Sequence, residues 1–208
     1  MTSLDRRAPD RLERQLDFVV QAHRLTGVGR QSRVAGGERR ENSAEHSWHL
    51  TLLALVLGEY APPEVDRWHA MRMLVVHDLV EIDAGDTFVY DAAAQEGKID
   101  RERAAARRLF GLLPVDQRDA FLALWEEFEA RETSDARFAA AMDRLAPFLL
   151  NLDHQGGTWA EHGVGADRVR EITAQIGQGA PELAPFVRAA IEGAVAAGWL
   201  PPQTPARL

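Results

Sequence analysis

Apolar residues recur at helical spacing along most of the chain, and this pattern predicts an all-α protein. Between residues 10 and 25 they fall on one broad stripe that includes Leu12, Leu16 and Val19, as expected for a helix with one buried face. The alternation of apolar and polar residues that marks a half-buried strand is nearly absent. The pattern therefore favours a bundle of helices.

Capping residues, prolines and glycines mark the helix boundaries. Asn42 and Glu45 have the spacing of a capping box, which predicts a helix from there to about residue 60. The proline pair at 62–63 predicts the start of the next helix, which we expect to end at residue 82 or 83, just before Gly85. Later helices are expected over residues 99–112, 115–131, 134–153, 169–175 and 181–197.

Two polar segments interrupt the helices and predict loops. Residues 26–40 are rich in Gly and Arg, and residues 86–97 are a stretch with several polar residues that follows Gly85. There is no internal repeat and no low-complexity segment. We expect a single domain over residues 1–208, with a core at about 10–155 and C-terminal helices at about 165–199 packed on it.

Composition and charge narrow the classes of partner and of site. The 208 residues are 46% hydrophobic and 27% charged, and the net charge of -8 argues against a nucleic-acid polymer as partner. There is no cysteine, so a metal can only be held by His, Asp and Glu. The N-terminal segment has no apolar signal region, and no apolar run is long enough to span a membrane. We therefore expect a cytoplasmic location.

One apolar helix carries charged residues in its middle. The stretch MRMLVVHDLVEIDAGD, residues 71–86, is apolar on nearly every side, which indicates a buried helix. It nevertheless contains His77, Asp78 and Glu81. Buried ionisable groups are costly unless they are paired or bound to a metal. These residues are therefore candidates for a metal site, and a buried ion pair without a metal is the alternative.

Two more candidates lie in other apolar helices. His46 stands at the start of SWHLTLLALVL, and Asp143 lies within FAAAMDRLAPFLL. Two imidazoles and two carboxylates suit a divalent cation with open positions for water and substrate. A packing or capping role is the alternative for His46, and a salt bridge with an arginine is the alternative for Asp143. A site with two metals would need His49 or His154 as a further ligand.

In this order, His46, the pair His77–Asp78 and Asp143 resemble the HD-domain phosphohydrolase superfamily. The phrases ENSAEHSWH and HDLVEIDAGDTF look more particularly like its 5'-deoxynucleotidase branch. The resemblance runs from about residue 16 to residue 153. It implies an all-α HD-domain helical bundle and hydrolysis of (deoxy)nucleoside 5'-monophosphates to nucleoside and phosphate.

The resemblance also implies roles for individual residues. It implies one divalent metal ion (manganese, cobalt or magnesium), and the ligands would be His46, His77, Asp78 and Asp143. Glu81 and Asp86 match the acidic residues that transfer protons and position water beside the scissile phosphate. Arg24 matches the arginine that holds the substrate phosphate, with Arg30, Arg39 and Arg40 as alternatives. A small-molecule nucleotide substrate and a homodimer are further expectations.

Two other functions stay open from the sequence. The first is another HD chemistry, which would act on a cyclic nucleotide, an alarmone or a nucleoside triphosphate. Enzymes of these kinds generally need more basic residues or a second metal, and this acidic chain offers little of either. The second is a non-catalytic HD module that binds a nucleotide without turning it over.

Overall fold

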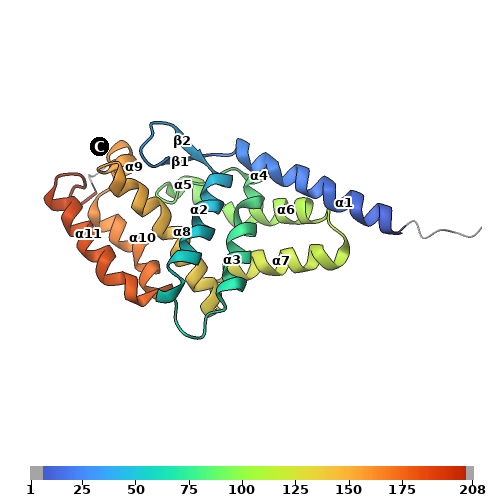
Figure 1. Cartoon of the computed structure of the whole chain (residues 1–208). Coiled ribbons are helices and arrows are strands. Elements are labelled where there is room, and N and C mark those ends of the chain that lie inside the picture. Colours follow the sequence, from blue (N-terminus) through green and yellow to red (C-terminus); the bar gives the residue numbers. More distant parts are fainter. Residues whose placement is uncertain (1–6, 205–208) are drawn as a thin grey trace, which may run out of the picture.

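The computed structural model describes residues 7–204, and helices make up most of that part of the chain (Figure 1). This confirms the all-α class. The α-helices are α1 (Arg7–Ala22), α2 (Ser43–Val56), α3 (Arg67–Val76), α4 (Glu81–Ala84), α5 (Ala92–Gln95), α6 (Lys98–Phe110), α7 (Val115–Ala130), α8 (Ser134–Asp153), α9 (Gly157–His162), α10 (Ala166–Gly179) and α11 (Ala184–Ala196). The 3-10 helices are η1 (His23–Gly27), η2 (Gly58–Tyr60), η3 (His77–Val80) and η4 (Pro181–Leu183), and the strands are β1 (Gly29–Arg33) and β2 (Arg40–Asn42).

Helix α8 lies at the centre of the bundle and packs against α2, α3, α7 and α10. It is buried on most sides, and its many alanines let neighbouring helices approach closely. The approach of α10 is closest at Gly179, where a Cβ atom would lie only 2.0 Å from the carbonyl oxygen of Arg137. Asp143 in the middle of α8 is therefore held at the centre of the molecule.

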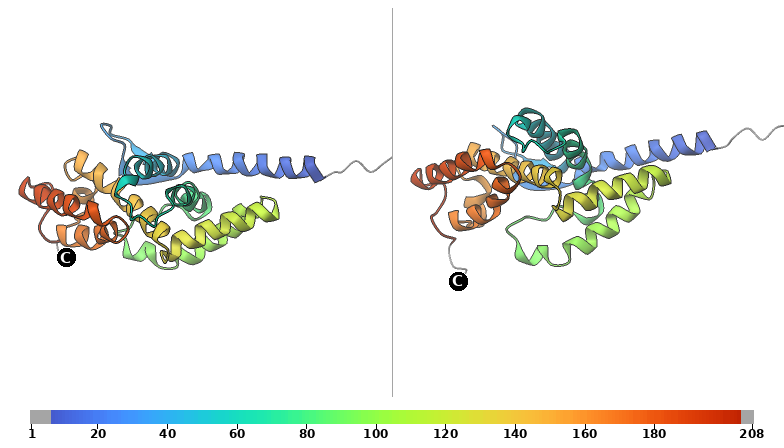
Figure 2. Two further views of the ribbon diagram at one scale, coloured as in Figure 1. Left: turned by 60° about the horizontal axis from the view of Figure 1, so that its bottom comes forward. Right: turned by 90° about the horizontal axis from the view of Figure 1, so that it is seen from below.

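The peripheral helices cover the two ends of this core. Helix α10 packs on the side of α8, and α11 packs on α10. Figure 2 shows α1 extending away from them, beside α6 and α7. The division into one domain over residues 1–208 stays a prediction, and residues 1–6 and 205–208 lie outside the described part. Among the described helices, none combines the length and apolarity needed to cross a lipid bilayer.

The expectation of a loop over residues 26–40 was wrong, because this segment forms most of a β-hairpin. Strands β1 and β2 pair antiparallel, with Gly29 opposite Asn42 and Arg33 opposite Arg40. The strands are polar, and the side chains that they bury are Ser32 and Glu41. No apolar alternation could therefore reveal them. The hairpin matters because it carries polar side chains into the centre of the protein.

The single helix expected from residue 62 to residue 83 is divided into three segments. Helix α3 begins only at Arg67, and Asp66 caps it by accepting hydrogen bonds from the backbone N–H groups of Trp68 and His69. The backbone tightens to the 3-10 helix η3 at His77 and returns to α4 at Glu81. Gly85 ends α4 with a φ of 75°, as the sequence indicated. A 3-10 segment inside a helix often marks a functional site, and here it carries His77 and Asp78.

We expect Asn42→Ala to destabilise the protein through the start of α2. The capping box is present: Asn42 accepts from the backbone N–H of Glu45 at 3.0 Å, and Glu45 accepts from that of Asn42 at 3.1 Å. Losing such a cap costs about 1 kcal/mol, or about 2–4 °C in melting temperature for a domain of this size. Thermal unfolding checks this, with Asn42→Asp as the control that keeps an acceptor. Equal melting temperatures for Asn42→Ala and the parent protein would contradict it.

Candidate metal centre

Three of the predicted metal ligands meet where α2 and η3 pack together. His46 comes from the first turn of α2, and His77 and Asp78 come from η3. One ligand atom of each lies within 4.8 Å of the others, and all three side chains are buried. Because η3 is a tight 3-10 turn, the consecutive residues His77 and Asp78 can both direct a ligand atom at the same position. These distances suit a single ion bound between them.

Asp143 joins this group from α8. Its Oδ1 atom lies 3.0 Å from Nε2 of His46 and 4.0 Å from Nε2 of His77. Burial alone raises the pKa of Asp143, but the charge of Arg144 and the hydrogen bond with His46 outweigh it and hold the pKa well below its ordinary value. All four residues predicted from the sequence thus lie together, with Asp143 ionised.

The histidine rings are oriented as metal ligands require. Nδ1 of His77 donates to the carbonyl oxygen of Leu74 at 2.9 Å, so Nε2 can carry the lone pair. That Nε2 atom is buried and has no hydrogen-bond partner within the described chain. It lies 2.9 Å from Oδ1 of Asp78 without the geometry of a hydrogen bond. Two nitrogens and two carboxylates directed at one point fit a divalent ion.

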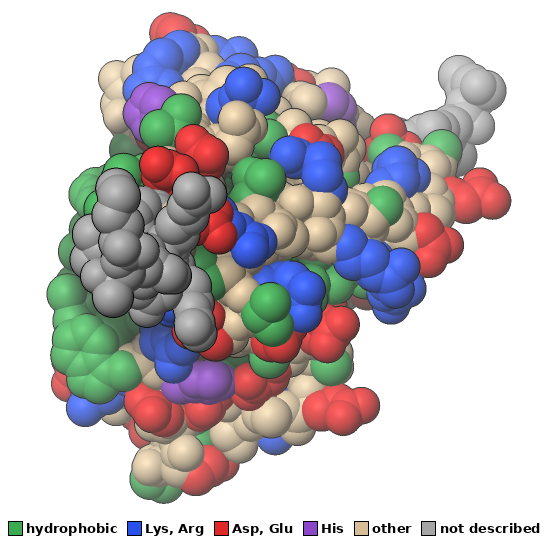
Figure 3. Space-filling view, turned by 90° about the vertical axis from the view of Figure 1, so that its right-hand side faces the viewer, with side chains coloured by type: hydrophobic (Ala, Val, Ile, Leu, Met, Phe, Trp, Pro, Cys, Tyr) green, Lys and Arg blue, Asp and Glu red, His purple; other side chains and the backbone are tan. Residues whose placement is uncertain are grey.

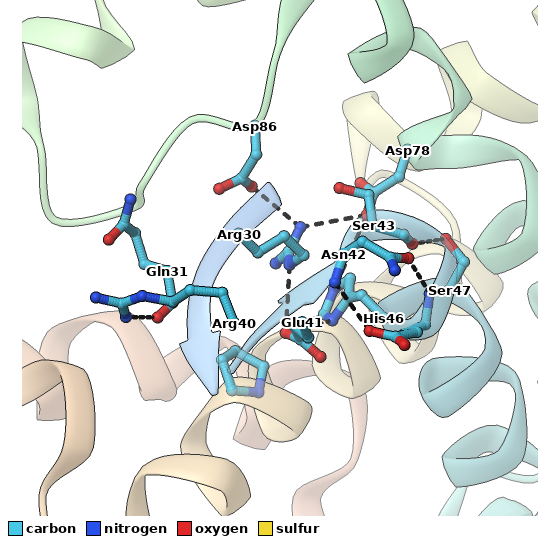
Figure 4. Close-up of polar contacts among 12 residues, drawn as sticks. Arg30, Gln31, Arg40, Glu41, Asn42, Ser43, His46, Ser47, Asp78 and Asp86 are labelled. Atoms are coloured by element: carbon cyan, nitrogen blue, oxygen red, sulfur yellow. Dashed lines mark hydrogen bonds and ion pairs between the residues drawn. The ribbon is translucent and has the colours of Figure 1, made fainter. Parts of the chain in front are cut away.

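Glu81 and Asp86 lie beside these ligands, and both are near Arg30 of β1. Figure 4 shows Arg30 between Asp78 and Asp86. Nη1 of Arg30 is 3.0 Å from Asp86, 3.4 Å from Asp78 and 3.9 Å from Glu81. Ser43 donates a hydrogen bond of 2.6 Å to the other oxygen of Glu81. Burial and the nearby Asp78 raise the pKa of Glu81 well above its ordinary value. The neutral form of the Glu81 carboxyl group is thereby favoured relative to an exposed glutamate.

Arg24 does not reach this group. It lies exposed in η1 and is not among the residues that line the cavity beside the candidate ligands. Of the alternatives, Arg39 pairs with Glu45, and Arg40 pairs with Glu161. Among these four arginines, Arg30 is the one that contacts the site. The role given to Arg24 stays a prediction, and the structure favours Arg30.

Glu41 is a site residue that the sequence did not reveal. Its Oε1 atom lies 3.4 Å from Nε of Arg30 and 3.6 Å from Nδ1 of His46, and the side chain is buried. Burial raises the pKa of Glu41 to about 7. In the sequence, Glu41 follows an arginine-rich segment that predicts a loop. Only the pairing of the two strands shows that the Glu41 side chain points into the protein. The carboxyl group faces Nδ1 of His46, on the side of the ring away from Asp143, at a distance longer than a hydrogen bond.

We expect Glu41→Gln to weaken metal binding by about 10–100-fold, because groups that orient a ligating histidine commonly contribute that much. Titration of metal-free protein with manganese, followed by calorimetry, measures the affinity. Glu38→Gln is the matched control, since Glu38 is an exposed carboxylate of the same hairpin. An unchanged affinity in Glu41→Gln would show that His46 needs no support from this residue.

A cavity of about 470 Å³ opens beside the candidate ligands. Its volume is within the usual range for small-molecule sites, roughly 300–1,000 Å³. Its walls include His77, Asp78, Glu81, Asp86 and Asp143. A ligand in this cavity would contact the acidic residues and Arg30 together.

The HD domain family model matches residues 22–184, which is most of the chain. The chain belongs to the HD-domain family. The family resemblance expected from the motifs is thereby confirmed. Three curated or solved relatives show how far the similarity extends.

A relative named 5'-deoxynucleotidase HDDC2 from Homo sapiens is 28% identical over 125 residues, which cover 58% of this chain and 60% of that protein. One from Danio rerio is 27% identical over 135 residues, covering 64% of this chain and 66% of that protein. This HD-domain chain thus spans about three fifths of the length of the curated relatives it matches.

A crystal structure of a protein named a predicted metal-dependent phosphohydrolase, from Magnetospirillum magnetotacticum MS-1, is 49% identical. It covers 93% of this chain and 100% of its own, with a TM-score of 0.88.

Proposed function

We propose that this HD-domain protein is a metal-dependent phosphohydrolase. The observation that carries the proposal is the meeting of His46, His77, Asp78 and Asp143 beside a cavity that Arg30 also lines. The family match and the names of the relatives support the same reaction class. A site that joins a divalent cation with a guanidinium is suited to phosphate esters.

His46, His77, Asp78 and Asp143 would hold the ion. When bound, it supplies Lewis-acid chemistry: it lowers the pKa of water and neutralises charge on phosphoryl oxygens. Arg30 presents its guanidinium to the same space, so it can hold two oxygens of a substrate phosphate. We assign to Arg30 the phosphate contact that the sequence had given to Arg24.

Glu81 and Asp86 have different tasks because their surroundings differ. Burial and the charge of Asp78 raise the pKa of Glu81, which favours the carboxyl form that can give a proton to the leaving oxygen of the ester. Asp86 is held 3.0 Å from Arg30, where it can orient both the guanidinium and a water molecule. In this account Glu81 is the general acid, and Asp86 is the residue that positions water.

We further propose deoxynucleoside 5'-monophosphates as the substrate class. The names of the curated relatives support this narrower choice, and the cavity volume suits a nucleotide. On the face in Figure 3, acidic and basic side chains are interspersed, unlike the continuous basic footprint that a nucleic-acid polymer needs. The identity of the metal, the homodimer and the cytoplasmic location stay predictions.

Product analysis by chromatography tests the substrate class. Metal-loaded protein is offered deoxy- and ribonucleoside 5'-monophosphates, a triphosphate and a cyclic nucleotide. We expect nucleoside and phosphate from the deoxynucleoside monophosphates first. Release of pyrophosphate or triphosphate, or opening of the cyclic nucleotide in preference, would assign one of the other HD chemistries. Tight binding of a nucleotide with no product from any substrate would indicate a binding module.

A further inference from the structure

Two further arginines line the cavity and share one neutral acceptor. Arg131 ends α7, and Arg144 lies next to Asp143 on α8. Oε1 of Gln175, on α10, accepts from Nη1 of Arg131 at 2.9 Å and from Nε of Arg144 at 3.2 Å. The three side chains come from three helices that meet only in the folded protein. They form a cluster, here called the arginine pair, at the wall of the cavity.

The charges of the arginine pair are poorly compensated. A neutral amide can orient two guanidiniums but cannot balance their charge. Arg144 has a carboxylate partner, Asp143, at 3.5 Å, but Asp143 also contacts His46. Burial and the charge of Arg144 both lower the pKa of Arg131. The buried Nε of Arg131 has no hydrogen-bond partner in the described part of the chain. An anion in the cavity would compensate both groups.

Lys98 lines the same cavity, and its positive charge is balanced by a carboxylate. Its Nζ atom lies 3.0 Å from Glu102 on the next turn of α6. Arg131 has no such ion pair in the described structure, and it also has a φ of 54° at the end of α7. This left-handed conformation is a common way to end a helix, although glycine is the usual residue there.

The arginine pair adjoins the candidate ligands on the side of Asp143 that faces away from His46. His46 contacts Oδ1 of Asp143, whereas Arg144 contacts Oδ2. The candidate ligands and the arginine pair therefore use different oxygens of the same carboxylate. Arg30 already faces Asp78, Glu81 and Asp86. A phosphate bound there needs no further cation from α7.

We propose that Arg131 and Arg144 bind a second anionic group of the substrate. This inference rests on the proposed function and extends its substrate class from nucleotides with one phosphate to nucleotides with two. The phosphate ester to be cleaved lies at the candidate ligands with Arg30, and a second, separate phosphate lies at the arginine pair. Arg30 and the arginine pair line the same cavity of about 470 Å³. The substrate class is then a nucleotide with phosphates at two positions, such as a deoxynucleoside 3',5'-bisphosphate.

Isothermal titration calorimetry on full-length Glu81→Gln protein with manganese tests the proposal. Glutamine has nearly the same size and shape as glutamate, so we expect binding to be kept while the proton donor is lost. The ligands are deoxyadenosine 5'-monophosphate and deoxyadenosine 3',5'-bisphosphate. We expect the bisphosphate to bind about tenfold more tightly. Adding Arg131→Gln should bring the two dissociation constants close together, whereas Arg170→Gln, an exposed site on α10, should keep the tenfold ratio.

A second variant keeps the test decisive if Arg131→Gln folds poorly. Gln175→Glu places a carboxylate between the two arginines, so it should raise the melting temperature and also abolish the preference for the bisphosphate. Equal affinities in the parent protein, or a preference that survives both variants, would overturn the proposal. The proposed function is tested separately by phosphate release from the wild-type protein. If the proposed function is wrong, neither nucleotide releases phosphate, whatever the ratio of their affinities.

Discussion

Asp78→Ala lowers the turnover of deoxynucleoside monophosphates by about a thousandfold or more while the protein stays folded. The side chain lies between His77 and Arg30, at 2.9 Å and 3.4 Å, and its low pKa of about 2 keeps it ionised. Removing it takes away one of two carboxylates from the candidate metal site. A thousandfold loss corresponds to about 4 kcal/mol of transition-state stabilisation.

Steady-state kinetics and manganese calorimetry on purified Asp78→Ala measure both losses, and circular dichroism verifies the fold. Asp83→Ala is the control, because Asp83 lies five residues further on, is exposed and pairs with Arg108. We expect it to keep activity within about twofold, as surface changes usually do. Wild-type turnover in folded Asp78→Ala would remove the metal-site assignment.

Arg30→Gln lowers kcat/KM by about a hundredfold, and Arg24→Gln changes it by no more than about twofold. Arg30 is nearly buried and contacts Glu41, Asp78 and Asp86, whereas Arg24 is exposed. Because the same substitution is made at both positions, the loss of charge is matched and only the location differs. Kinetics with one deoxynucleoside monophosphate compare the pair.

The opposite ranking would return the phosphate contact to Arg24. Arg30→Lys adds a further check, since it keeps the charge but loses the planar pair of donors. We expect intermediate activity for that variant. Full activity in Arg30→Lys would show that the site needs only a positive charge.

The helices and the candidate ligands could be predicted because their signals are local. A charge within an apolar helix, as at His77, Asp78 or Asp143, reads as a buried group that needs compensation. The capping pair Asn42 and Glu45 likewise marks the start of α2 within four residues. These features depend on periodicity and spacing, which the sequence displays directly.

The rest of the site depends on contacts between distant segments. Arg30 and Glu41 enter through a polar hairpin whose pairing has no apolar signature. Likewise, Arg131, Arg144 and Gln175 meet only where α7, α8 and α10 pack together. The 3-10 turn at His77 was also hidden, because an α-helix and a 3-10 helix share nearly the same apolar pattern over four residues.

The most direct test of this account is metal add-back with phosphate release as the readout. Chelator-treated protein is titrated with manganese, cobalt or magnesium at saturating deoxynucleoside 5'-monophosphate. The account predicts no release without metal and full activity at one ion per chain, with His46, His77, Asp78 and Asp143 as the ligands. Release that persists in metal-free protein, or that requires two ions per chain, would contradict it.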